Sequence, residues 1–168
     1  FVDLIIDAGH TLECQGDNDG DPAEGSGVII NATNINIAET AAISANALGF
    51  PRTQGPGGGS STSTYGGGAS HGGIGGAGRS SPASTTRYGS LSQPLSLGSG
   101  GGHASYGGEG GGAIKLNVSD TLTIAGTVSA NGLNGHDVNN GGAAGGSIWL
   151  IADTLAGAGS ITADAGDG

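Results

Sequence analysis

The chain has 168 residues, of which 39 are glycine and only 4% are aromatic, so any apolar core must be thin and built from Ile, Val, Leu and Ala. Fourteen acidic residues against four basic ones give a formal charge of −10, which opposes binding to nucleic-acid phosphates or anionic lipid. We expect no membrane insertion, because the sequence shows neither an apolar run of spanning length nor a signal-peptide pattern, and its single cysteine excludes an internal disulfide framework.

One pattern of alternating apolar residues occurs four times along the chain. The copies lie near residues 1–16, 27–48, 111–132 and 146–166. Each complete copy contains three short apolar groups separated by small or polar residues, which predicts three short strands per copy. A unit of about twenty residues with three strands is the length of one turn of a parallel β-helix. We therefore predict a single all-β domain over residues 1–168, a right-handed parallel β-helix of about four turns.

The first copy, "DLIIDAGHTLECQG" at 3–16, matches only the later two-thirds of the pattern, so it begins within a turn. Its Cys14 aligns with alanines at 45, 130 and 163, which predicts a small buried side chain rather than a reactive thiol. The polar residues that follow these positions, Asn46, Asn131 and Asp164, suit a tight turn.

An acidic segment, "GDNDGDPAE" at 16–24, follows the first copy. Its carboxylates belong to Asp17, Asp19, Asp21 and Glu24. They surround Gly20 with the alternate spacing of oxygen ligands in a Ca²⁺ loop, but Val28 and Ile29 stand where an EF-hand carries its final glutamate. The segment is therefore either a Ca²⁺ site or a solvated acidic turn, and we predict no other cofactor.

Two N-glycosylation sequons occur, Asn31-Ala-Thr in the second copy and Asn117-Val-Ser in the third. Each asparagine lies three residues after the first core residue of its copy, which places both at the same outward position. If the source is eukaryotic, we expect glycans on both, although a chain this rich in Asn, Ser and Thr also produces sequons by chance.

Residues 49–110 form a long insertion of Gly, Ser and Thr without hydrophobic periodicity. Such a composition is typical of a disordered linker, but a structureless loop of this length inside a compact domain is improbable. We expect an ordered excursion that folds back on the β-helix wall or on a neighbouring chain, with positive-φ turns and extended segments that glycine allows to approach closely. Its predicted anchors are Tyr65, Tyr88, Tyr106, Leu91, Leu95 and Leu97.

In the fourth copy, Trp149 and Ile151 replace Lys115 and Asn117 at outward positions. Exposed apolar residues of this kind indicate cover by the insertion or by another protein. The predicted interface residues are Trp149, Ile151, Tyr65, Tyr88 and Tyr106.

Over nearly its whole length the chain resembles the glycine-rich, β-helix-like repeats of very large secreted and cell-surface proteins. The residues that carry this resemblance are "GGGAIKLNVSDTLTIAGTVSANG" at 110–132, "GGSIWLIADTLAGAGSITADAG" at 145–166, "SHGGIGG" at 70–76 and "YGSLSQPLSLGSGGG" at 88–102. The resemblance implies the architecture and an extracellular or cell-surface location, and it transfers no catalytic residue.

Three classes of function are compatible with a parallel β-helix: an enzyme, a structural module and a binding module. A polysaccharide lyase needs cationic side chains to neutralise a uronate, and the chain offers only Arg52, Arg79, Arg87 and Lys115. A hydrolase needs paired carboxylates on one face, and only Asp3 and Asp7 have matching strand parity. We therefore expect no enzyme. The leading prediction is a structural module of an extracellular filament or surface stalk, whose partners are copies of itself or adjoining repeats. The alternative is an adhesin or carbohydrate-binding module.

Overall fold

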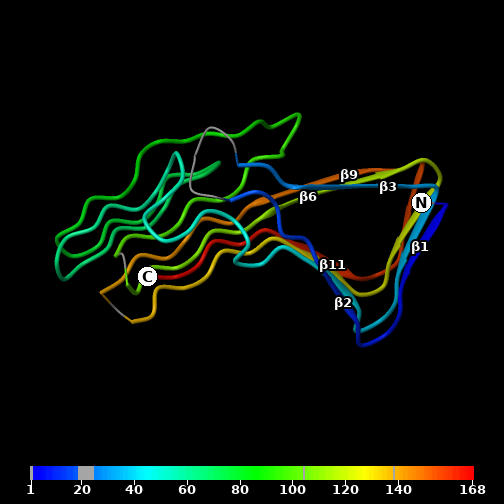
Figure 1. Ribbon diagram of the computed structural model, residues 1–168, viewed down its shortest axis with the longest axis horizontal. Helices are drawn as coiled ribbons and strands as arrows, with labels where there is room; N and C mark the ends of the chain where they lie inside the picture. Colours follow the sequence, from blue (N-terminus) through cyan, green and yellow to red (C-terminus); the bar gives the residue numbers. More distant parts are fainter. Residues whose placement is uncertain (1, 19–24, 104, 138) are drawn as a thin grey trace.

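The computed structural model describes residues 2–18, 25–103, 105–137 and 139–168. Within them all regular structure is strand, and eleven short strands form three parallel sheets. The strands enclose a triangular outline, which we call the three-sheet lobe; beside it lies a bundle of extended segments without strands (Figure 1). We call this second part the glycine-rich lobe; it comprises residues 49–110, 133–145 and 164–168.

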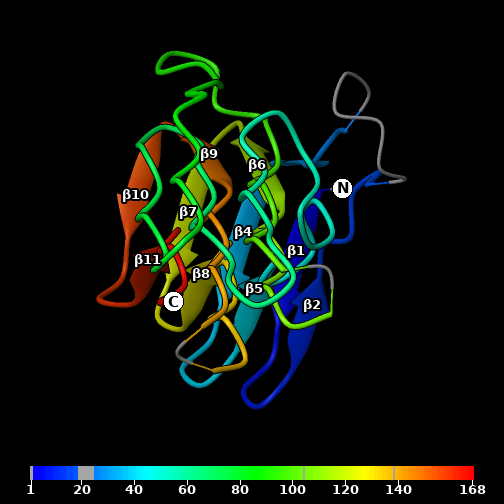
Figure 2. The same cartoon turned by 90° about the vertical axis from the view of Figure 1, so that its left-hand side faces the viewer.

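Each sheet collects equivalent strands from successive copies. Sheet I consists of β3 (Val28–Ala32), β6 (Ala113–Val118) and β9 (Ser147–Ile151). Sheet II consists, in order, of β1 (Asp3–Ile6), β4 (Asn34–Ile37), β7 (Thr121–Ile124) and β10 (Thr154–Ala156). Sheet III consists, in order, of β2 (Thr11–Glu13), β5 (Ala42–Ser44), β8 (Thr127–Ser129) and β11 (Ser160–Thr162). Figure 2 shows the rows of neighbouring strands from the side.

The strand register reproduces the predicted alignment of the copies. Ile43 pairs with Val128, and Thr121 pairs with Thr154 at an offset of 33 residues. The first copy contributes only β1 and β2, because the strand that enters sheet I first is β3 of the second copy. The prediction of an all-β fold with parallel strands, one set per copy, is confirmed at this level.

The core lies between the three sheets and is made of stacked aliphatic columns. Ile35 and Leu122 are neighbours in one column, and both are almost completely buried. Ile43 and Val128 form the equivalent column of sheet III. Because each inward side chain packs against its counterpart one copy away, a simple repeat of Ile, Leu and Val suffices to fill the interior.

A column of small residues and a ladder of polar ones mark one corner of the stack. Cys14 is buried, as predicted, and burial raises the pKa of its thiol, which disfavours the reactive thiolate. At the following position the Asn46 side-chain oxygen accepts the backbone N–H of Asn131 at 2.7 Å, and the Asn131 oxygen accepts that of Asp164 at 2.8 Å. The turn residues therefore connect successive copies by hydrogen bonds.

The glycine-rich lobe is built around the buried segment 98–102. Its backbone N–H groups donate in different directions, and their acceptors are the carbonyls of Gly111, Gln54, Gly108 and Gly67. A strand in a sheet bonds to at most two neighbours. Because Gly108 and Gly111 belong to the same neighbouring segment, the segment 98–102 donates to three others, as the threefold symmetry of a polyproline-II-like chain without internal hydrogen bonds allows.

Close approach, rather than unusual dihedrals, explains most of the glycines. A Cβ built on Gly101 would lie 2.0 Å from the Gly141 carbonyl oxygen, which no real side chain tolerates. Among the described glycines of the insertion, only Gly55 and Gly89 have positive φ. The predicted close packing of extended segments is therefore found, while positive-φ turns are few.

The anchors of the insertion differ in part from those predicted. Leu97 is buried and packs with Phe50, a residue that composition and spacing did not single out. Leu91 is fully exposed, so its predicted anchoring role is wrong. It lies in a loop, residues 89–95, of which 89–93 are exposed.

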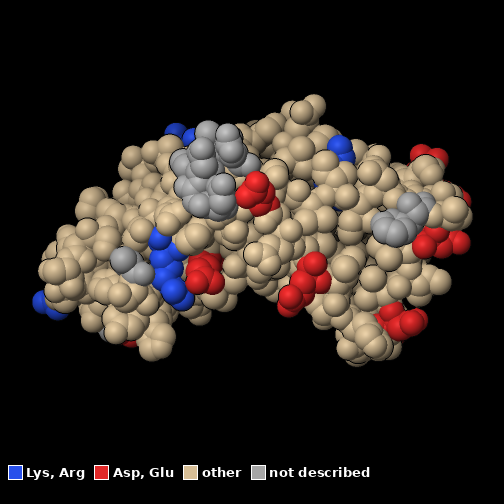
Figure 3. Space-filling model, in the orientation of Figure 1, with Lys and Arg blue, Asp and Glu red and all other residues tan. Residues whose placement is uncertain are grey.

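Charged side chains lie mainly at the surface. Arg52 pairs with Glu109 at 3.3 Å and also donates to the Gly107 carbonyl, which ties two segments of the glycine-rich lobe together. On the face shown in Figure 3, several acidic side chains gather at the strand-bearing end, and the basic ones are few and separate. The described part of the chain contains no helix of the length and apolarity that a membrane span requires.

Candidate functional site

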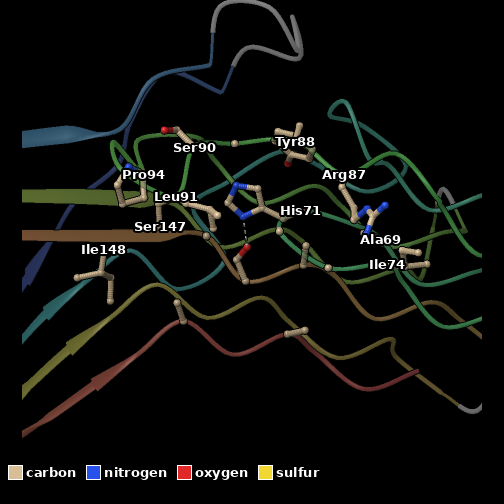
Figure 4. A pocket seen from close by; sticks show the side chains of 18 residues that line it. Ala69, His71, Ile74, Arg87, Tyr88, Ser90, Leu91, Pro94, Ser147 and Ile148 are labelled. Atoms are coloured by element: carbon tan, nitrogen blue, oxygen red, sulfur yellow. Dashed lines mark hydrogen bonds between the residues drawn. The ribbon is translucent and has the colours of Figure 1, made fainter.

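A cavity of about 630 Å³ opens where the glycine-rich lobe meets the last copy. It runs from Ile74 and Arg87 at one end to Pro94 and Ile148 beside the strands (Figure 4). Half of the residues that line it are glycine or alanine, and the lining comes from residues 69, 71–74, 87–91, 94, 144–148, 163 and 165. These surfaces suit the packing of an extended main chain, the same contact that fills the interior of the lobe.

His71, from the segment "SHGGIGG", forms the inner wall of this cavity. Its Nδ1–H donates to the Gly145 carbonyl oxygen at 2.9 Å, so Nε2 is left as an acceptor. Burial lowers the pKa of His71 and outweighs the opposing effect of backbone hydrogen bonds, so the ring is neutral at pH 7. The histidine thus connects the insertion to the segment that leads into the last copy.

Tyr88 supports the same wall from inside the lobe. Its ring packs against that of His71 with centroids 4.7 Å apart. Its hydroxyl donates to the Leu97 carbonyl at 2.6 Å and lies 2.7 Å from the Ser99 hydroxyl. Burial raises the pKa of Tyr88 to about 12, despite hydrogen bonds with Ser99 that lower it. Of the predicted interface tyrosines, Tyr88 thus makes its contacts within the chain, whereas Tyr106 is half exposed.

The last copy leaves its inward side chains uncovered. Leu122 and Val128 of the third copy are completely buried, but their register partners Leu155 and Ile161 are 60% and 46% exposed. The side chains are of the same kind and differ only in having no further copy on one side. This end of the stack therefore presents an apolar surface framed by the free edges of β9, β10 and β11.

The outward face of sheet I holds the other predicted residues. Trp149 and Lys115 are register neighbours, and the Lys115 Nζ lies 3.7 Å from the Trp149 ring centroid, a cation–π contact that partly covers the tryptophan. Ile151 beside them remains 39% exposed. Alignment of the copies placed the lysine and the tryptophan at equivalent positions, so their contact could have been predicted from the sequence.

The two sequons lie together on the same face. Asn31 and Asn117 are exposed register partners, and the Asn117 amide donates to the Asn31 side-chain oxygen at 3.0 Å. Their predicted equivalence in position is found, and glycosylation itself stays a prediction.

Only one of the four predicted Ca²⁺ ligands, Asp17, belongs to the described residues. Asp19, Asp21 and Glu24 lie outside the described residues, and Asp17 exchanges two backbone hydrogen bonds with Ser26. In the described ranges no group of three His, Cys, Asp or Glu side chains is placed to hold a metal. Ca²⁺ binding by this segment stays a prediction.

Comparison of the chain with protein-family models, with curated proteins and with solved structures found no match.

Proposed function

We propose that the chain is a structural module of an extracellular filament or surface stalk, in which the three sheets are a right-handed parallel β-helix that continues end to end. The observation that carries this proposal is the contrast between the buried Leu122 and the exposed Leu155 at equivalent positions. Covering Leu155 and Ile161 with another turn would gain on the order of 1 kcal/mol for each, about half the value of burying such a side chain completely.

The edge strands at this end carry neither charged residues nor proline, two of the features that oppose strand addition. Strands β9, β10 and β11 read SIWLI, TLA and SIT, without a charged residue or a proline. Proteins that avoid edge-to-edge contact place such residues on their edge strands. An edge of this composition supports continuation of the sheets.

The polar ladder has a direction that also favours continuation. Each side-chain oxygen accepts the backbone N–H of the next copy: Asn46 accepts from Asn131, and Asn131 accepts from Asp164. Asp164 thus ends the ladder with a carboxylate, which is itself a strong acceptor for one more backbone N–H. A second such pair, Asn134 with Asp167, repeats the arrangement. Both would fix the register of an added turn.

Sedimentation velocity over a range of protein concentrations tests this proposal. The wild-type chain should form end-to-end assemblies, and the double variant Leu155→Asp/Ile161→Asp should weaken them at least tenfold, because two carboxylates would be buried. The charge-matched control Asn36→Asp/Ser63→Asp changes exposed positions that line neither this end nor the cavity beside it and should assemble like the wild type. A wild-type chain that stays monomeric up to millimolar concentration, or equal association of both variants, would overturn the proposal.

A further inference from the structure

In the described residues, sheets II and III have four strands each, whereas sheet I has three. The described stack starts with β1 in sheet II and β2 in sheet III, and the first strand of sheet I is β3, one level further along. If β1 and β2 of a second copy pair with β10 and β11, its β3 lies one level too far from β9. The two strands would then be about 9.6 Å apart, twice the usual spacing. Moving the copy closer would make its β1 overlap β10.

The strand position that stays empty beside β9 is continuous with the cavity beside His71. Ser147 and Ile148, the first residues of β9, line the cavity together with Gly145 and Gly146, which lead into the strand. The opposite wall, which includes Leu91 and Pro94, belongs to the loop 89–95. A chain segment lying along β9 would therefore enter through the cavity.

The lower levels of the stack show what occupies the equivalent position. Residues Gly111–Ala113, the lead-in to β6, are covered by the lead-in to β9: Ser147 N–H donates to the Gly112 carbonyl at 3.0 Å, and Gly111 N–H donates to the Ala144 carbonyl at 3.0 Å. Ala113 and Ser147 are register partners. The cavity lies beside Gly145 and Gly146, as the lead-in to β9 lies beside Gly111 and Gly112.

In the third and fourth copies both lead-in residues are glycine, because a Cβ has no room there, whereas the second copy carries Gly25 and Ser26. On Gly146 a Cβ would lie 1.7 Å from the Gly112 carbonyl oxygen, and on Gly111 one would lie 2.1 Å from that of Ala130. The strands that follow share alternating aliphatic residues. The three segments are GSGVIINA at 25–32, GGAIKLNV at 111–118 and GGSIWLIA at 145–152.

We propose that β9 and the adjoining cavity form a binding site for one extended segment of this type, which adds to β9 as a parallel strand. Such a segment begins with two glycines, or with glycine and serine, continues with a small residue and ends with alternating aliphatic residues. Such strand addition takes affinity from main-chain hydrogen bonds and specificity from pockets for alternate side chains. The inference rests on the proposed function, since it identifies the partner of the uncovered end. Ile148 and Leu150 are the partly covered core residues on which the new aliphatic side chains would pack.

The test uses a blocked synthetic peptide with the sequence of residues 110–120, GGGAIKLNVSD, added to the intact chain. Residue-resolved amide hydrogen exchange should slow in β9, and the Trp149 indole resonance should shift. A first control peptide replaces the positions of Ile114 and Leu116 by Asp, which removes the inward side chains. A second replaces the positions of Gly111 and Gly112 by Val, which fills the close contacts. Each control should bind more than tenfold more weakly.

The outcomes separate this inference from the proposed function. Protection of β9 by the peptide in a chain that never self-associates supports the strand site and counts against the filament. Self-association without any peptide-dependent protection of β9 supports the filament and overturns the strand site. Protection confined to β3, or equal binding of the peptide with valines, would likewise overturn it, because the glycine-lined cavity would then play no part.

Discussion

The glycine-rich lobe predicts a large effect for a single added methyl group, Gly101→Ala. A Cβ on Gly101 would lie 2.0 Å from the Gly141 carbonyl oxygen, whereas real contacts of this kind are not shorter than 3.0 Å. The two segments must therefore separate by about 1 Å. The two segments are joined by the Gly141 N–H, which donates to the Gly102 carbonyl at 3.2 Å, and by the Ala144 N–H, which donates to the Ser99 carbonyl at 2.9 Å, and a shift of this size would break both bonds.

The cost follows from the groups left without partners. Each unsatisfied buried backbone group costs about 1–3 kcal/mol, so two broken bonds predict a loss of roughly 2–6 kcal/mol in the free energy of unfolding. Urea denaturation followed by circular dichroism and Trp149 fluorescence would measure the loss. The matched control is Gly76→Ala, because a Cβ there meets no atom within 4 Å and the φ of this residue is not positive.

Equal stability of the two variants would refute the account of close-packed extended segments. A loss confined to the glycine-rich lobe, seen as faster hydrogen exchange there with β4–β8 unchanged, would still agree with it, because the two lobes have separate interiors.

Other substitutions test the core, the cavity wall and its hydrogen bonds. Leu122→Ala should cost about 2–5 kcal/mol in the free energy of unfolding, while Leu155→Ala, at the equivalent position of the uncovered end, should cost less than about 1 kcal/mol in the monomer; thermal melts of dilute samples compare them. Burial holds the pKa of His71 below its ordinary value of 6.5, so the unfolded state binds more protons than the folded state. The stability that this residue contributes is therefore present above pH 6.5 and is lost as the pH falls through its folded pKa. His71→Gln should therefore flatten the pH dependence of stability between about pH 7 and 5, and an unchanged dependence would contradict a buried neutral ring. Tyr88→Phe should cost about 1–3 kcal/mol by leaving the Leu97 carbonyl without its donor, as measured by urea denaturation, and a neutral result would show that water replaces the hydroxyl.

The repeat allowed much of the three-sheet lobe to be predicted from sequence. Internal alignment placed Trp149 opposite Lys115 and Ile151 opposite Asn117, and both are register pairs in the structure. The alignment works because each side chain packs on its own counterpart, so similarity between copies is itself a contact map. Cys14 was placed correctly for the same reason.

The glycine-rich lobe was predicted only in outline. Composition indicated extended segments in close contact, but it could not select 98–102 as the central segment, because glycine carries no side chain whose pattern reveals its neighbours. The same lack of pattern made Leu91 look like an anchor and hid Phe50. The uncovered end became visible only when Leu155 and Leu122 could be compared by exposure.

The central claim is that the end formed by β9, β10 and β11 is made to be continued. Amide hydrogen exchange of the intact chain, measured at increasing protein concentration, tests it most directly. The account predicts that exchange slows with concentration in β10 and β11 and in β1 and β2, which pair when copies stack, while the rates in β4–β8 stay constant. Exchange rates that are independent of concentration, or protection limited to the glycine-rich lobe, would contradict it.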